Sequence, residues 1–131
     1  MALDYGTTRI GVALSDPLHI TAQPYAVIDT AAADFDDRIK SIVVESDVER
    51  IVVGLPVHLS GREGLSAEGA RKLARRVGEI CGVPVELADE RFSTKTAEEA
   101  LLEANTRRDK RRQVIDKVAA AVILQNWLNA R

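Results

Sequence analysis

The hydrophobic pattern changes its period along this chain, and this change restricts the fold more than any other feature. Two short β-prone runs, residues 1–5 and 9–15, are joined by a Gly-Thr-Thr segment of hairpin length. In that segment Gly6 can adopt the left-handed backbone conformation that tight turns favour. Residues 25–28 form another β-prone run after the break at Pro24. The sequence therefore predicts that three antiparallel strands open the fold.

Helical and strand patterns then alternate. In chain order, the pattern predicts a helix from residue 33, a strand at 51–53, a helix over 70–80, a strand at 83–87, a short helix from the capping box of Thr96 and Glu99 to residue 102, and a long helix over 114–128. Strands separated by helices pair in parallel through right-handed crossovers. The predicted fold is therefore α/β, with a mixed five-stranded sheet and helices on both faces, in one domain over residues 1–131.

Composition limits the class of protein. With 131 residues and 46% hydrophobic content, the chain can bury one core. No stretch approaches the roughly 20 apolar residues of a membrane span, and the first residues lack a secretory signal pattern, so we expect a cytoplasmic protein. Cys81 is the only cysteine, which excludes an internal disulfide and a thiolate zinc site and favours a buried thiol.

Asp4 and Glu90 stand where sites form in α/β sheets, near the carboxyl ends of parallel strands, and Asp116 on the last predicted helix could converge with them. Asp4 lies inside an apolar first strand, where burial of its charge requires compensation, most simply by a cation. Glu90 follows the strand that ends at Leu87, and Asp116 falls in the first turn of the last predicted helix, beside the small residues 119–121. Such carboxylates suit Mg²⁺, with Mn²⁺ as the alternative ion, and two ions about 4 Å apart would hydrolyse a phosphodiester.

Each of these groups also has a structural alternative. Asp116 could stabilise a helix N-terminus through the macrodipole, and Glu90 could form a surface ion pair with Arg91. His19 and His58 have no partner at the spacing of a metal site or a triad, so we expect them to be structural or exposed.

Basic residues cluster just before the last predicted helix: Arg107, Arg108, Lys110, Arg111 and Arg112. They form a positive patch in a chain of net charge −2, and their place before Asp116 favours phosphate contacts over a solvated loop. Arg9 and Arg91 stand beside the acids in sequence and either bind phosphate or pair with the acids. Aromatic residues make up only 4% of the chain, which favours recognition of a folded RNA or branched DNA by shape.

Five motifs in order along the chain resemble those of the YqgF family, also called RuvX: Leu3-Asp4-Tyr5-Gly6, Arg9-Ile10-Gly11-Val12-Ala13, Val53-Gly54-Leu55-Pro56, Asp89-Glu90-Arg91-Phe92-Ser93-Thr94, and Ile115-Asp116-Lys117 with Ala119-Ala120. The family comprises Holliday-junction resolvases and nucleases for the 5′ end of precursor 16S ribosomal RNA. The resemblance implies a ribonuclease H-like fold, catalytic and metal-binding roles for Asp4, Glu90 and Asp116, and a role in ribosome maturation. A resolvase acts on two strands, so a homodimer is the corresponding expectation.

Two other classes of protein remain open. The segment from Asp4 to Thr8 also resembles the phosphate loop of actin, heat-shock chaperones and sugar kinases, but those proteins clamp ATP between two such domains. A non-catalytic factor that binds RNA or acts in transcription would keep the fold and the charge pattern. Metal-dependent cleavage that an Asp4→Asn substitution abolishes would distinguish the nuclease from both.

Overall fold

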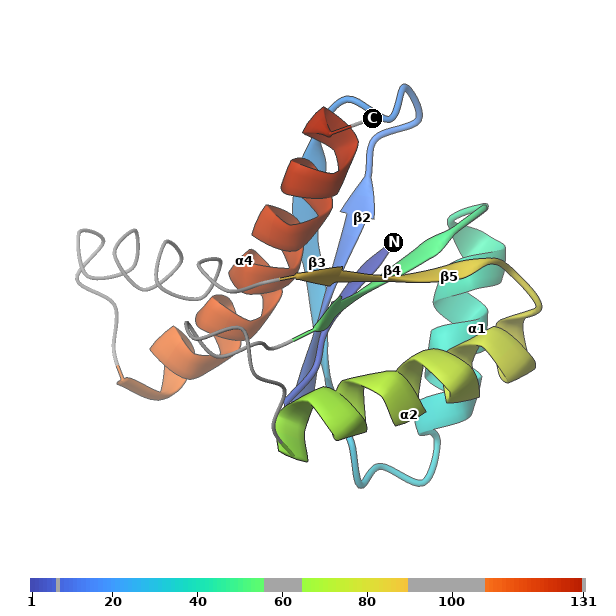
Figure 1. The fold of residues 1–131 in the computed structure, drawn as a ribbon. Coiled ribbons are helices and arrows are strands. Elements are labelled where there is room, and N and C mark those ends of the chain that lie inside the picture. Colours follow the sequence, from blue (N-terminus) through green and yellow to red (C-terminus); the bar gives the residue numbers. More distant parts are fainter. Residues whose placement is uncertain (7, 56–64, 90–107, 131) are drawn as a thin grey trace.

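The computed structural model describes residues 1–6, 8–55, 65–89 and 108–130, without the side chains of residues 65, 66, 89 and 108–116. Its elements follow in the order β1 (Ala2–Asp4), β2 (Arg9–Ser15), β3 (Ala22–Asp29), α1 (Phe35–Glu45), β4 (Ile51–Leu55), α2 (Leu65–Cys81), β5 (Val85–Asp89) and α4 (Arg108–Asn129), as Figure 1 shows. The short helix predicted from Thr96 lies outside the described residues, as does His58.

The strands form one five-stranded sheet in the order β3-β2-β1-β4-β5. β2 pairs antiparallel with β1 and β3, whereas β4 pairs parallel with β1 and β5. Helix α4 covers one face of the sheet, and α1 and α2 cover the other (Figure 1). The predicted mixed sheet with helices on both faces is therefore confirmed.

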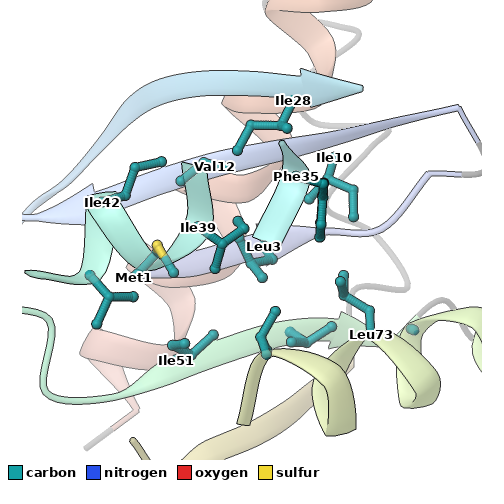
Figure 2. Close-up of a cluster of buried hydrophobic side chains, with 14 residues drawn as sticks. Met1, Leu3, Ile10, Val12, Ile28, Phe35, Ile39, Ile42, Ile51 and Leu73 are labelled. Atoms are coloured by element: carbon teal, nitrogen blue, oxygen red, sulfur yellow. The ribbon is translucent and has the colours of Figure 1, made fainter. Parts of the chain in front are cut away.

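The core consists of two apolar layers, one on each side of the sheet. Leu3 and Val53 belong to the cluster that also contains Phe35 of α1 and Leu73 of α2, shown in Figure 2. Ala2, one position away on β1, belongs instead to the cluster under α4, because successive side chains of a strand alternate between faces. The same alternation places Asp4 on the α4 face.

The edge strand β3 is longer than predicted and includes Pro24, which we had interpreted as a break. Proline lacks an N–H group and is tolerated where only one side of the strand is paired. The pairing skips one residue here, since Val12 pairs with Ala26 while Ala13 pairs with Pro24. Tyr25 is therefore the extra residue of a β-bulge, which the sequence pattern did not indicate.

Two other boundaries also differ from the predictions. β5 begins at Val85 instead of residue 83, because Pro84 contributes only its carbonyl, which accepts the Ile51 N–H at 2.9 Å. Helix α4 begins at Arg108, six residues before the predicted start. Arginine and lysine are good helix formers, so the basic run, which we had placed before the helix, forms its first turns.

Gly6 serves a different purpose from the predicted one. Its backbone does not adopt the left-handed conformation. A Cβ atom at this position would instead overlap the carbonyl oxygen of Arg9. Glycine is thus required between β1 and β2 because two backbone segments approach closely.

The β2–β3 connection is organised by one carboxylate. Asp16 accepts the backbone N–H groups of Ile20 at 2.6 Å and Thr21 at 2.9 Å. Gln125 on α4 adds two further bonds: its Oε1 accepts the N–H of Ala22 at 3.0 Å, and its Nε2 donates to the carbonyl of Ile20 at 2.9 Å. The loop is therefore fixed both internally and against the last helix.

These bonds to Thr21 and Ile20 lower the pKa of Asp16 below its ordinary value of 3.8. Since the folded-state pKa is depressed, the loop stabilisation is present above pH 3.8 and is lost as the pH falls through the lower folded-state pKa. We expect the amide NMR shifts of Ile20 and Thr21 to titrate with a midpoint below 3.8 in wild type and not in Asp16→Asn. A midpoint at or above 3.8 would contradict this account.

Candidate active site

The carboxyl ends of three parallel strands meet at one edge of the sheet. Asp4, the last residue of β1, is in register with Gly54 on β4, and the next residue of β4, Leu55, is in register with Asp89 at the end of β5. Glu90 follows Asp89 directly in sequence but lies outside the described residues. The edge that the sequence analysis selected thus carries Asp4 and the end of β5.

Asp4 has unusually small neighbours on its face of the sheet. Its partners are Gly11 on β2 and Gly54 on β4, and Ala88 on β5 follows in the same row. Asp4 is half-buried there. Glycine at both paired positions adds no side chain beside the Asp4 carboxylate, and glycine in a strand often marks a place that a ligand approaches, so these neighbours fit a divalent cation bound through oxygen ligands.

Helix α4 runs antiparallel to β1 across this face. Near the C-terminal end of the helix, the Trp127 indole N–H donates to Glu86 Oε2 at 2.6 Å, close to the start of β5. Ala120, seven residues earlier, is fully buried in the same cluster as Ala2. The first half of α4 therefore extends toward the edge that carries Asp4.

The spacing along α4 and β1 relates the backbone positions of Asp116 and Asp4 to two buried alanines of one cluster. It precedes Ala120 by four residues, one helical turn or about 6 Å toward the strand ends. Asp4 follows Ala2 by two residues, which is about 6.6 Å in the same direction. Asp116 and Asp4 therefore lie at similar distances along their own elements from Ala120 and Ala2, while the side chain of Asp116 lies outside the described residues.

The macrodipole alternative for Asp116 is weakened by the same helix. Since α4 begins at Arg108, Asp116 is its ninth residue instead of a first-turn residue. Helix-dipole effects decline within the first turn. The predicted first-turn position of Asp116 is wrong, and stabilisation of the helix N-terminus no longer accounts for this acid.

The predicted nucleic-acid-binding residues divide into three groups. Arg9 is the first residue of β2, two positions before Gly11, so it lies on the same face and edge as Asp4 and diagonal to it, at about 7–8 Å between Cα atoms. Arg108, Lys110, Arg111 and Arg112 lie in the first turns of α4, with side chains outside the description. Arg91 and Arg107 lie outside the described residues.

The sequence analysis did not identify the glycine neighbours of Asp4 as part of this site. Gly11 and Gly54 were each noted only as members of a family motif. Glycine inside a strand is the signal that could have found them, since it often marks a place that a ligand approaches. Only the sheet register showed that both flank the same carboxylate.

Other chemically notable groups lie away from this edge. His19 is exposed in the β2–β3 connection, as expected, and Trp127 packs, partly buried, against the cluster under α4. Cys81 is half-buried, and desolvation raises the pKa of its thiol, so it is a poor nucleophile.

Two searches of the described residues complete the survey. No group of three or more His, Cys, Asp or Glu side chains could hold a metal ion among those described, a set that excludes the side chains of Glu90 and Asp116. No helix in the described ranges is long and apolar enough to cross a membrane.

The arrangement of the sheet and helices defines an α/β fold of the ribonuclease H-like class. It is similar to the solved structure titled "T. thermophilus RuvC in complex with Holliday junction substrate", with a TM-score of 0.52 and 18% sequence identity over 98% of this chain and 92% of that one. A second structure of Thermus thermophilus RuvC gives a TM-score of 0.51 at 19% identity, covering 98% and 93% of the two chains.

Sequence similarity identifies the family. The model of the RuvX family, described as Holliday junction resolvase, matches residues 1–130. A relative from Myxococcus xanthus (strain DK1622), named "Putative pre-16S rRNA nuclease", is 46% identical over 131 residues, covering 99% of this chain and 87% of the relative. One of the same name from Listeria innocua serovar 6a is 45% identical over 132 residues, covering 98% and 96%. The chain belongs to the RuvX family, and the expectation of a nuclease, a hydrolase acting on phosphodiester bonds, is confirmed.

Proposed function

We propose that this protein is a metal-dependent nuclease that matures the 5′ end of precursor 16S rRNA in the cytoplasm, with residues 1–131 acting as one nuclease domain. The observation that carries the proposal is the position of Asp4, a half-buried carboxylate between two glycines at the carboxyl edge of the sheet. The relatives named above support precursor 16S rRNA as the substrate.

In this proposal Asp4, Glu90 and Asp116 are the ligands of Mg²⁺, or of Mn²⁺ in its place. The bound ions would supply an activated water and neutralise the charge that develops on the phosphodiester. Asp4 is the last residue of a strand that is paired on both sides, so the sheet positions the backbone that leads up to it. Glu90 follows the end of β5, and Asp116 would approach Asp4 from α4, the helix that covers this face of the sheet.

The chain's basic residues would bind the nucleic-acid backbone. Arg9 is placed to contact a phosphate beside the reacting one, since it shares the face and the edge of Asp4. The first turns of α4 carry four basic residues at a helix N-terminus, where the helix dipole also attracts anions. Arg91 and Arg107 complete the proposed set. Such contacts give affinity without sequence preference, so the substrate would be recognised by its shape.

The second candidate function is resolution of Holliday junctions, because the family model carries that description. It would require two active sites that act on two strands, and hence a homodimer. The third candidate, a factor that binds RNA without cutting it, predicts the same contacts but no cleavage.

The test is cleavage of labelled precursor 16S rRNA ends and of four-way DNA junctions, with Mg²⁺, Mn²⁺ or EDTA, by wild type and Asp116→Asn. We expect the RNA to be cut with either ion and to remain intact with EDTA or the variant. Cleavage of the junction alone would identify a resolvase. Salt-sensitive binding of either substrate without cleavage would contradict a nuclease function and favour the binding factor.

A further inference from the structure

Tyr5, the residue after Asp4, packs on the opposite side of the sheet. Because side chains alternate along the chain here, Asp4 faces α4 while Tyr5 packs against the cluster under α1 and α2. The pairing of β1 with both neighbouring strands ends at Asp4. The backbone just beyond Asp4 therefore depends on contacts other than the sheet for its position.

The tyrosine ring packs against the backbone of α2 at Gly69, where there is no side chain. A Cβ atom added at Gly69 would overlap the ring and the hydroxyl oxygen of Tyr5. The neighbouring Ala67 and Ala70 are fully buried, so the first turns of α2 pack closely at this point. Figure 1 shows these turns (green) beside the end of β1.

Glycine inside a helix is unfavourable relative to alanine, and at Gly69 a packing reason exists. Gly78 lies in the same helix, but the nearest atom to a Cβ added there is Val85 Cγ2 at 3.4 Å, an ordinary contact. The two glycines thus differ in what a methyl group would displace. Only at Gly69 would it displace the residue that adjoins Asp4.

We propose that Tyr5, seated on Gly69, is a positioning residue that fixes the end of β1 so that the Asp4 carboxylate is preorganised for a divalent cation. This inference rests on the proposed function. The ring does not contact the ion; it acts through the backbone that it shares with Asp4. Residues that orient a metal ligand commonly change metal affinity by about 10- to 100-fold when they are altered.

The test measures Mn²⁺ binding by electron paramagnetic resonance, together with thermal unfolding, in Gly69→Ala, Tyr5→Ala, the double variant and the matched control Gly78→Ala. We expect Gly69→Ala and Tyr5→Ala each to weaken Mn²⁺ binding by about tenfold or more, and Gly78→Ala to bind like wild type. The double variant should bind no more weakly than Tyr5→Ala, because both changes remove one contact.

A purely structural role would lower the unfolding temperature and leave the Mn²⁺ affinity of the folded protein unchanged. That result in both Tyr5→Ala and Gly69→Ala would overturn the inference while the proposed function stands. A wild-type protein that binds no Mn²⁺ would instead remove the proposed metal site, and this inference with it. Tyr5→Phe, which keeps the ring, should retain wild-type affinity, and a loss there would contradict positioning by ring packing.

Discussion

Replacing Asp4 with asparagine should abolish cleavage while the protein stays folded. Asparagine keeps the size of the side chain but removes the negative charge that a cation requires. A metal ion stabilises the transition state by several kcal/mol, and each 1.4 kcal/mol is a factor of ten, so we expect a loss of about a thousandfold or more. The measurement is the single-turnover rate on precursor rRNA, with Mn²⁺ binding followed in parallel.

Asp37→Asn is the matched control. Asp37 is an exposed carboxylate in the first turn of α1, on the other side of the sheet. Its loss should leave cleavage and Mn²⁺ binding unchanged. Thermal unfolding of Asp4→Asn should remain cooperative, which would show that the loss of cleavage is not a loss of folding. Wild-type cleavage by Asp4→Asn would exclude the proposed site.

Phe35→Ala should produce the largest loss of stability. Phe35 is the largest of the fully buried side chains, with 1% of its surface exposed, and the Arg76 guanidinium lies 4.7 Å from its ring centroid. Truncating a buried phenylalanine costs about 3–5 kcal/mol through lost burial and the cavity left behind. Domains are typically stable by only about 5–15 kcal/mol, so the midpoint of urea unfolding should fall sharply.

Val44→Ala in the same helix provides the comparison. Val44 is 74% exposed, so its truncation should change the free energy of unfolding by no more than about 0.5 kcal/mol. If the two variants unfold at similar urea concentrations, the cluster that contains Phe35 does not hold α1 and α2 on the sheet as the packing indicates.

The sequence predicted the order of most elements because their patterns are local. The β-prone run of β2 and the helical spacing from Phe35 to Val43 are both visible within a few consecutive residues. Boundaries were less predictable where a local signal had two meanings. Pro24 was interpreted as a break, but proline is tolerated in the edge strand β3. The basic run was placed before the last helix, although arginine and lysine favour helix.

The candidate site, like the fold, was predicted only in part from the sequence. By itself the sequence selected Asp4, because a carboxylate in an apolar strand requires compensation, and it located the relevant edge of the sheet from the strand order. Only the tertiary structure showed that Gly11 and Gly54 flank Asp4 and that Tyr5 packs against Gly69. The physical reason is that strand register and helix packing bring together residues that are distant in sequence. A glycine acts at such a contact because it has no side chain, and the local sequence does not show which residue will lie against it.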